Sequence, residues 1–141
     1  SALVIPWCTY TDPQVAAVGT PEAEAAAQGV ETQAFLQPLE GVDRAVLDGE
    51  TEGFAKVWVR KGTDEIVGAV VVARNAGDMI GLYVLAIQRR LGLKALAGLI
   101  LPYPTQAEAV RKTGDLYNRT RLTPAVQKWM GRWLKWRRGG D

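Results

Sequence analysis

The residues best suited to chemistry lie in one short segment, LPYPTQAE, at 101–108. Tyr103 stands between Pro102 and Pro104, whose rings restrict the backbone and would hold the tyrosine rigidly. A phenol can donate a hydrogen bond, or bind a soft metal when ionised. With a free pKa of about 10, it is a poor proton shuttle at neutral pH. The alternative interpretation is an aromatic side chain that fills a gap under a turn.

Thr105 and Glu108 follow at the spacing of a helix-capping box. In that motif the threonine hydroxyl and the glutamate carboxylate each accept a hydrogen bond from the other residue's backbone N–H. A purely structural role and a functional role are both compatible with this spacing. The residues alone leave the two interpretations open.

Two residue counts exclude most other catalytic arrangements. The chain has no histidine, so it holds no Ser–His or Cys–His pair and no zinc–histidine site. Cys8 is the single cysteine, which excludes an internal disulfide and fits a reducing, cytoplasmic setting. Cys8 follows a tryptophan on a predicted strand and has no basic neighbour, so we expect a buried, inert thiol. No metal site is expected.

The composition is that of one globular domain with an uneven charge. The 141 residues are 48% hydrophobic and 23% charged, which allows one core of ordinary size. No apolar run reaches the roughly 18 residues needed to span a membrane. The net charge is +2, but the body is mildly acidic and basic residues gather at 128–138. This is not the evenly basic surface of a nucleic-acid-binding protein.

The first 30 residues are predicted to form a strand, a turn and a helix. Residues 4–11 are β-branched and aromatic and predict a strand, which a turn or a single helical turn over 12–19 follows. Thr20 and Pro21 predict the start of a helix, with Thr20 as its cap and Pro21 in the first helical position. Gly29 is expected to end this helix.

A β-hairpin is the clearest element of the sequence. Residues 30–37 have weak strand character, and Pro38 indicates an edge strand or its exit. Asp43 is expected to cap a short helix. Alternating apolar residues over 54–61 and a second apolar run over 66–73, joined by a polar turn, then predict two antiparallel strands.

The elements after the hairpin are predicted to be helical. Residues 76–91 predict one largely buried helix, and a shorter apolar helix follows over 93–100. A turn at 101–105 leads into a last helix through Tyr117. The apolar side of residues 79–87 is either core or subunit interface. We predict an α+β fold, in which helices pack on one face of a small antiparallel sheet.

Three segments of this sequence match one known domain in order and spacing. They are PWCTYTDPQVAAVGTPEAEA at 6–25, DGETEGFAKVWVRKGTDEIVGAVVVARNAGDMI at 48–80, and LPYPTQAEAVRKTGDLY at 101–117. Together they resemble the dimerisation domain of the pyridine nucleotide-disulfide oxidoreductases, the family of glutathione reductase, lipoamide dehydrogenase and mercuric reductase. We assign residues 3–120 to this domain.

The resemblance implies a role at a twofold subunit interface. In that family a Pro-Thr-x-x-Glu loop reaches the partner's active site, opposite the flavin and a redox cysteine pair. Pro104 and Thr105 would then lie near the partner's flavin, and Tyr103 and Glu108 would be the catalytic residues. Tyr103 stands where glutathione and lipoamide enzymes have histidine and mercuric reductases have tyrosine. Leu101 departs from the histidine that many mercuric-reductase-like proteins carry.

The resemblance also implies cofactors and partners outside this chain. The family uses FAD and NAD(P)H and forms homodimers. This sequence has no GxGxxG fingerprint and no CxxxxC pair. We therefore expect the FAD and NAD(P) domains of the same enzyme to be its partners. The chain alone is expected to bind neither cofactor and to have no activity.

The last part of the chain, 121–141, predicts a basic, Trp-rich amphipathic helix. Its apolar stripe is formed by Val126, Trp129, Met130, Trp133 and Leu134. An apolar face with basic residues behind it is typical of helices that lie in a membrane interface. An alternative function is therefore a module that docks a membrane or a partner protein through 124–138, which would make it membrane-peripheral. Packing of this helix on its own domain or dimer mate is the other interpretation.

Overall fold

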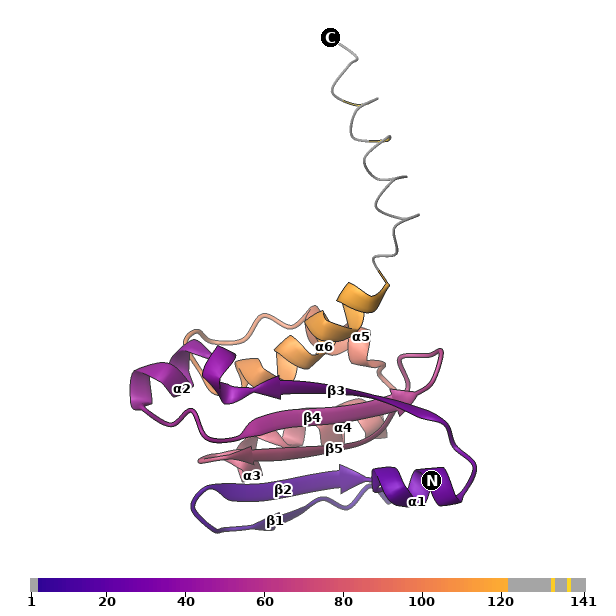
Figure 1. Ribbon diagram of the computed structural model, residues 1–141, viewed down its shortest axis with the longest axis horizontal. Helices are drawn as coiled ribbons and strands as arrows, with labels where there is room; N and C mark the ends of the chain where they lie inside the picture. Colours follow the sequence, from indigo (N-terminus) through magenta and orange to yellow (C-terminus); the bar gives the residue numbers. More distant parts are fainter. Residues whose placement is uncertain (1–2, 122–132, 134–136, 138–141) are drawn as a thin grey trace.

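The computed structural model describes residues 3–121 together with Trp133 and Arg137 (Figure 1). Within this part of the chain, five strands form one antiparallel sheet in the order β1-β2-β5-β4-β3. The strands are β1 (Trp7–Thr9), β2 (Gln14–Gly19), β3 (Thr32–Pro38), β4 (Phe54–Arg60) and β5 (Ile66–Ala73). The helices are α1 (Glu22–Ala27), the 3-10 turn η1 (Leu39–Gly41), α2 (Asp43–Asp48), α3 (Ala76–Met79), α4 (Gly81–Gln88), α5 (Leu93–Ala97) and α6 (Glu108–Thr120). The predicted α+β class is confirmed.

The core lies between the sheet and helices α3 to α6 (Figure 1). Antiparallel register places Phe35, Val57, Ala69 and Val18 in one row across four strands. All four are buried. Phe35 meets the ring of Tyr117 on α6 edge-on, with 5.6 Å between ring centroids. The alternating apolar residues of the hairpin sequence are therefore those on the side of the sheet that the helices cover.

The turn predicted over 12–19 is wrong, because Gln14–Gly19 is strand β2. This strand pairs with both β1 and β5 and buries Ala16 and Val18. Its centre is the pair Ala16 and Ala17, and alanine has low intrinsic strand preference. Hydrogen bonding on both sides therefore decides its conformation. The strand expected over 4–11 is correspondingly short, covering Trp7–Thr9 only.

The cap predicted at Thr20 is also wrong. Helix α1 begins at Glu22, Pro21 occupies the cap position, and no side chain caps the helix. The Thr20 carbonyl instead accepts a hydrogen bond from the Trp58 indole at 2.9 Å. The indole lies over Gly68, where an added Cβ would come within 2.6 Å of the ring. Gly68 is therefore required for the packing of Trp58.

The helix predicted over 76–91 divides into α3 and α4 at Ile80. One side of this pair is buried, and its members are Met79, Ile80, Tyr83 and Ala86. The prediction of a largely buried helix over 76–91 is only partly right, because Leu91 is 42% exposed. Leu85 is 51% exposed. Helix α4 is therefore apolar both toward the core and toward the outside.

Gly114→Ala should destabilise the fold by about 1–3 kcal/mol, although alanine is the better helix former. Helix α5 crosses α6 so closely that a Cβ at Gly114 would lie 2.6 Å from the Ala97 nitrogen and 2.8 Å from the Leu93 carbonyl oxygen. Urea unfolding measures the change. Gly81→Ala is the matched control, because its Cβ would meet no atom within 4 Å. Equal effects of the two substitutions would contradict this packing.

The amphipathic helix predicted over 121–141 lies almost entirely outside the described residues. Within this range only Arg121, Trp133 and Arg137 are described, and the Arg137 guanidinium lies 5.1 Å from the centroid of the Trp133 ring. The membrane- or partner-docking alternative depends on this segment and stays a prediction. In the part of the chain that the structure describes, no helix combines the length and apolarity needed to cross a bilayer.

Candidate functional site

Tyr103 lies on the loop that connects α5 to α6 and passes beside α2 (Figure 1). Its side chain is 70% exposed rather than packed under the turn. The hydroxyl donates a hydrogen bond to Oδ2 of Asp43 at 2.5 Å. Asp43 is the first residue of α2, and no side chain caps that helix. The predicted capping role of Asp43 is therefore wrong, and its carboxylate binds the phenol instead.

This hydrogen bond determines the chemical state of Tyr103. The bond to Asp43, and then the charge of that carboxylate, raise the pKa of Tyr103 above its ordinary value, and the Glu108 charge adds a smaller effect. The side chain is therefore a neutral phenol at physiological pH. Its one proton is donated to Asp43, so the lone pairs of the oxygen remain to accept a hydrogen bond or a cation.

Glu108 forms a cluster with two basic residues of its own helix. One carboxylate oxygen, Oε1, lies 3.3 Å from Arg111 and 3.9 Å from Lys112. Helix α6 begins at Glu108, with Ala107 at the cap position and no side-chain cap hydrogen bond. The capping-box interpretation of Thr105 and Glu108 is therefore wrong.

Three buried polar atoms in this loop have no hydrogen-bond partner among the described residues. They are Thr105 Oγ1, Gln106 Oε1 and Glu108 Oε2. The rest of Gln106 is anchored, because its Nε2 donates to Glu50 at 3.3 Å. A buried acceptor or hydroxyl without a partner costs about 1–3 kcal/mol. Three such atoms within four residues indicate a loop whose hydrogen bonding is incomplete in the single chain.

A cavity of about 370 Å³ joins this loop to the outer side of α3 and α4. Its lining combines apolar and polar side chains, from Asn75, Asp78, Met79, Leu82, Leu101, Thr105, Gln106 and Ala107. The loop and the exposed apolar side of α4 are therefore neighbouring parts of one surface. Ile100, at the start of the loop segment, is 99% exposed and extends its apolar area.

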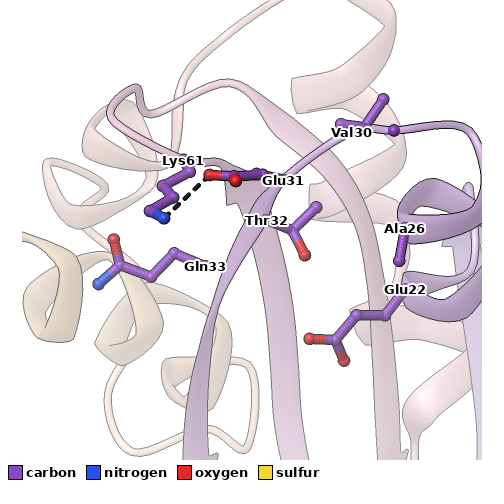
Figure 2. Close-up of a pocket in the computed structure, with 8 residues that line it drawn as sticks. Glu22, Ala26, Val30, Glu31, Thr32, Gln33 and Lys61 are labelled. Atoms are coloured by element: carbon purple, nitrogen blue, oxygen red, sulfur yellow. Dashed lines mark hydrogen bonds and ion pairs between the residues drawn. The ribbon is translucent and has the colours of Figure 1, made fainter.

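A second cavity, of about 790 Å³, lies between α1 and the start of β3 (Figure 2). Glu31 and Lys61 form an ion pair of 2.9 Å at its wall. It opens at the end of β3 opposite α2 and the Tyr103 loop (Figure 1). None of the buried polar atoms that lack partners belongs to its lining. We therefore place the candidate site at the loop.

The structure brings the predicted site residues onto one loop but does not pair them as expected. Tyr103 and Glu108 make no hydrogen bond to each other, and Pro104 and Thr105 are half-buried between them. Asp43, which binds Tyr103, stands sixty residues earlier in the chain. No spacing in the sequence indicates this contact.

The single cysteine and the acidic residues add no second site. Cys8 is half-buried and packs against the core, close to the buried environment expected for it. Between residues 3 and 121, no group of three or more histidine, cysteine or acidic side chains is arranged to hold a metal ion.

The fold is a small α+β domain, and comparison with known proteins identifies its family. Residues 5–113 match the model of the pyridine nucleotide-disulphide oxidoreductase dimerisation domain. This chain belongs to that family. It is similar to mercuric reductase from Shewanella putrefaciens, with 36% identity over 115 residues, covering 82% of this chain and 21% of that protein. Dihydrolipoyl dehydrogenase from Cupriavidus necator is 33% identical over 118 residues, covering 84% of this chain and 25% of that protein.

Solved structures show the same fold. LpdA from Mycobacterium tuberculosis superimposes with a TM-score of 0.74 and 28% identity, over 80% of this chain and 25% of that one. The HOCl-induced flavoprotein disulfide reductase RclA from Escherichia coli has a TM-score of 0.75 at 23% identity, over 80% and 26% of the two chains, and supports the fold alone. The chain spans about a fifth to a quarter of the length of these relatives.

Proposed function

We propose that this chain is the interface part of a homodimeric, FAD-dependent oxidoreductase of the mercuric-reductase-like type. In the complete enzyme, electrons would pass from NAD(P)H through FAD to a disulfide or metal-ion substrate. This sequence carries no GxGxxG turn and no CxxxxC pair. The cofactor sites therefore belong to the other domains of the enzyme, which are partners of this chain. A cytoplasmic location stays a prediction.

The apolar outer side of α4 supports the dimer. Leu85 is exposed on α4, Leu91 is exposed just beyond the end of this helix, and Leu82 and Ile87 of α4 are half-buried. Leu82 and Ile87 pack partly against the core. The exposed apolar surface of this group is left uncovered in the single chain. Contiguous exposed apolar side chains of this kind mark protein–protein contacts. In a twofold dimer this surface would meet its own copy.

The incomplete hydrogen bonding of the loop supports a role for its residues in the partner subunit's site. Tyr103 is exposed, and the buried atoms Thr105 Oγ1 and Glu108 Oε2 lack partners among the described residues. A partner subunit could supply the missing groups. Tyr103 and Glu108 would then act in the partner's redox site, and Pro104 and Thr105 would border its flavin. FAD would supply the electron transfer itself.

The chain alone should self-associate but should not oxidise NAD(P)H, with or without added FAD. Sedimentation equilibrium measures the first property and absorbance at 340 nm the second. Concentration-dependent dimerisation without turnover is the expected result. A strictly monomeric chain at high concentration would remove the support for an interface role. Measurable NAD(P)H oxidation would contradict the assignment of the cofactor sites to other domains.

A further inference from the structure

We propose that Asp43 is a positioning residue that fixes Tyr103 in the orientation from which it acts on the partner subunit. The inference rests on the proposed function, in which Tyr103 reaches the partner's site. The observation that carries it is the 2.5 Å hydrogen bond between the Tyr103 hydroxyl and the Asp43 carboxylate. Both side chains are at the surface, so the contact is not a by-product of core packing.

The Asp43 carboxylate is free to serve this purpose. It stands at the first residue of α2 but makes no cap hydrogen bond to that helix. The basic residue that follows it, Arg44, pairs with Asp48 at 2.7 Å instead. Among the described residues, the hydrogen bond from Tyr103 is the only hydrogen bond or ion pair that the Asp43 carboxylate makes.

The backbone that carries Asp43 is held in place by core packing and by a hydrogen bond from α6. The residues on either side of it in α2 and η1 include Leu39, Val42 and Ala45, which are fully buried. Lys112 of α6 donates a hydrogen bond to the Gly41 carbonyl at 2.6 Å, which ties this turn to the helix that follows the loop. The acceptor of the phenol is therefore held by the fold on both sides.

Glu108 does not compete for this role. The charged groups that face the phenol are Asp43 and, at longer range, Glu108. The Glu108 carboxylate is engaged by Arg111 at 3.3 Å, and Lys112 lies within 3.9 Å. The charge of Glu108 is thus compensated within α6, whereas Asp43 is left to the tyrosine. The family resemblance would make Glu108 the carboxylate that pairs with residue 103. In this structure the Tyr103 hydroxyl donates its hydrogen bond to Asp43.

The first test measures the titration of the Tyr103 phenol in this chain. Tyrosine is labelled with ¹³C at Cζ, and Tyr103→Phe identifies the signal of Tyr103. Loss of the bond should lower the pKa of Tyr103, so Asp43→Asn should move its titration to lower pH. Asp43→Glu keeps the charge, so its titration of Tyr103 should lie between those of Asp43→Asn and the wild type. Glu40→Gln, which removes an exposed carboxylate three residues earlier, should leave the curve unchanged. Coincident wild-type and Asp43→Asn curves would overturn the inference, whatever the enzyme does.

The second test asks whether Asp43 acts through Tyr103 in the complete dimeric enzyme. Asp43→Asn should lower kcat about threefold to tenfold, the effect of losing one hydrogen bond. In the Tyr103→Phe background the same substitution should have no further effect, because residues that act as a unit are not additive. An undiminished effect in that background would overturn the positioning role. If Tyr103→Phe alone leaves kcat unchanged, the proposed function is wrong. The titration of Tyr103 does not depend on the enzyme, so it still shows whether Asp43 holds the phenol.

Discussion

Replacing Leu85 by aspartate should weaken self-association of this chain by about a hundredfold or more, because the dimer would have to bury two charges that have no partner. The side chain projects from the outer side of α4 and is 51% exposed in the single chain. At this exposed position a charged group should change the stability of the monomer little. In a twofold dimer it would be buried without a partner on each subunit. Sedimentation equilibrium at a series of concentrations gives the dissociation constant.

A matched substitution separates this effect from general loss of solubility or fold. Leu36→Asp changes an equally apolar, exposed residue on β3, at a position that alternates with buried Phe35 and so lies on the opposite face of the sheet. It should leave the dissociation constant within about twofold of wild type, as expected for a surface change outside the interface. Circular dichroism should be unchanged for both variants. Equal weakening by both would contradict the placement of the interface on α4.

Tyr103→Phe should slow turnover of the complete enzyme by about tenfold or more, the effect of losing one hydrogen bond to a charged group in the partner's site. The substitution removes only the hydroxyl, so the ring and the loop between its two prolines keep their shape. The side chain is exposed, and its one hydrogen bond within the described part of the chain is to Asp43. Dimerisation should therefore be unaffected. Steady-state kinetics and sedimentation measure the two properties on the same sample.

Tyr10→Phe is the control for this experiment. Tyr10 is also an exposed tyrosine, and it lies beside β1, at the opposite edge of the sheet from β3 and α2. Its hydroxyl should be dispensable for turnover. If Tyr103→Phe dissociates the dimer, the hydroxyl is structural. If the two variants have the same turnover as wild type, Tyr103 has no catalytic role.

Local patterns in the sequence predicted those parts of the fold that depend on neighbouring residues. Alternation at Ala55, Val57 and Val59 identified β4 because each is a core residue of one sheet face. Pro38 correctly indicated an edge strand, because proline lacks the N–H that an inner strand must donate. The order of motifs identified the family, which the comparisons confirm.

Tertiary contacts determine the features that the sequence could not predict. Strand β2 forms because two neighbours supply its hydrogen bonds, not because Ala16 and Ala17 favour strands. The two sides of α4 are alike in composition, so only the packing shows that Tyr83 is inside and Leu85 outside. The contact between Asp43 and Tyr103 joins distant segments across the fold, which no local pattern reports.

Subunit complementation tests most directly whether the Tyr103 loop serves a neighbouring subunit. One enzyme carries Tyr103→Phe, and a second carries serine in place of its redox cysteines. If tyrosine and cysteines come from different subunits, each mixed dimer regains one complete site. Random reassociation should then restore about a quarter of wild-type activity. Activity no higher than the residual activity of the Tyr103→Phe subunits, with mixed dimers shown to be present, would place Tyr103 and the cysteines in the same subunit and contradict the proposal.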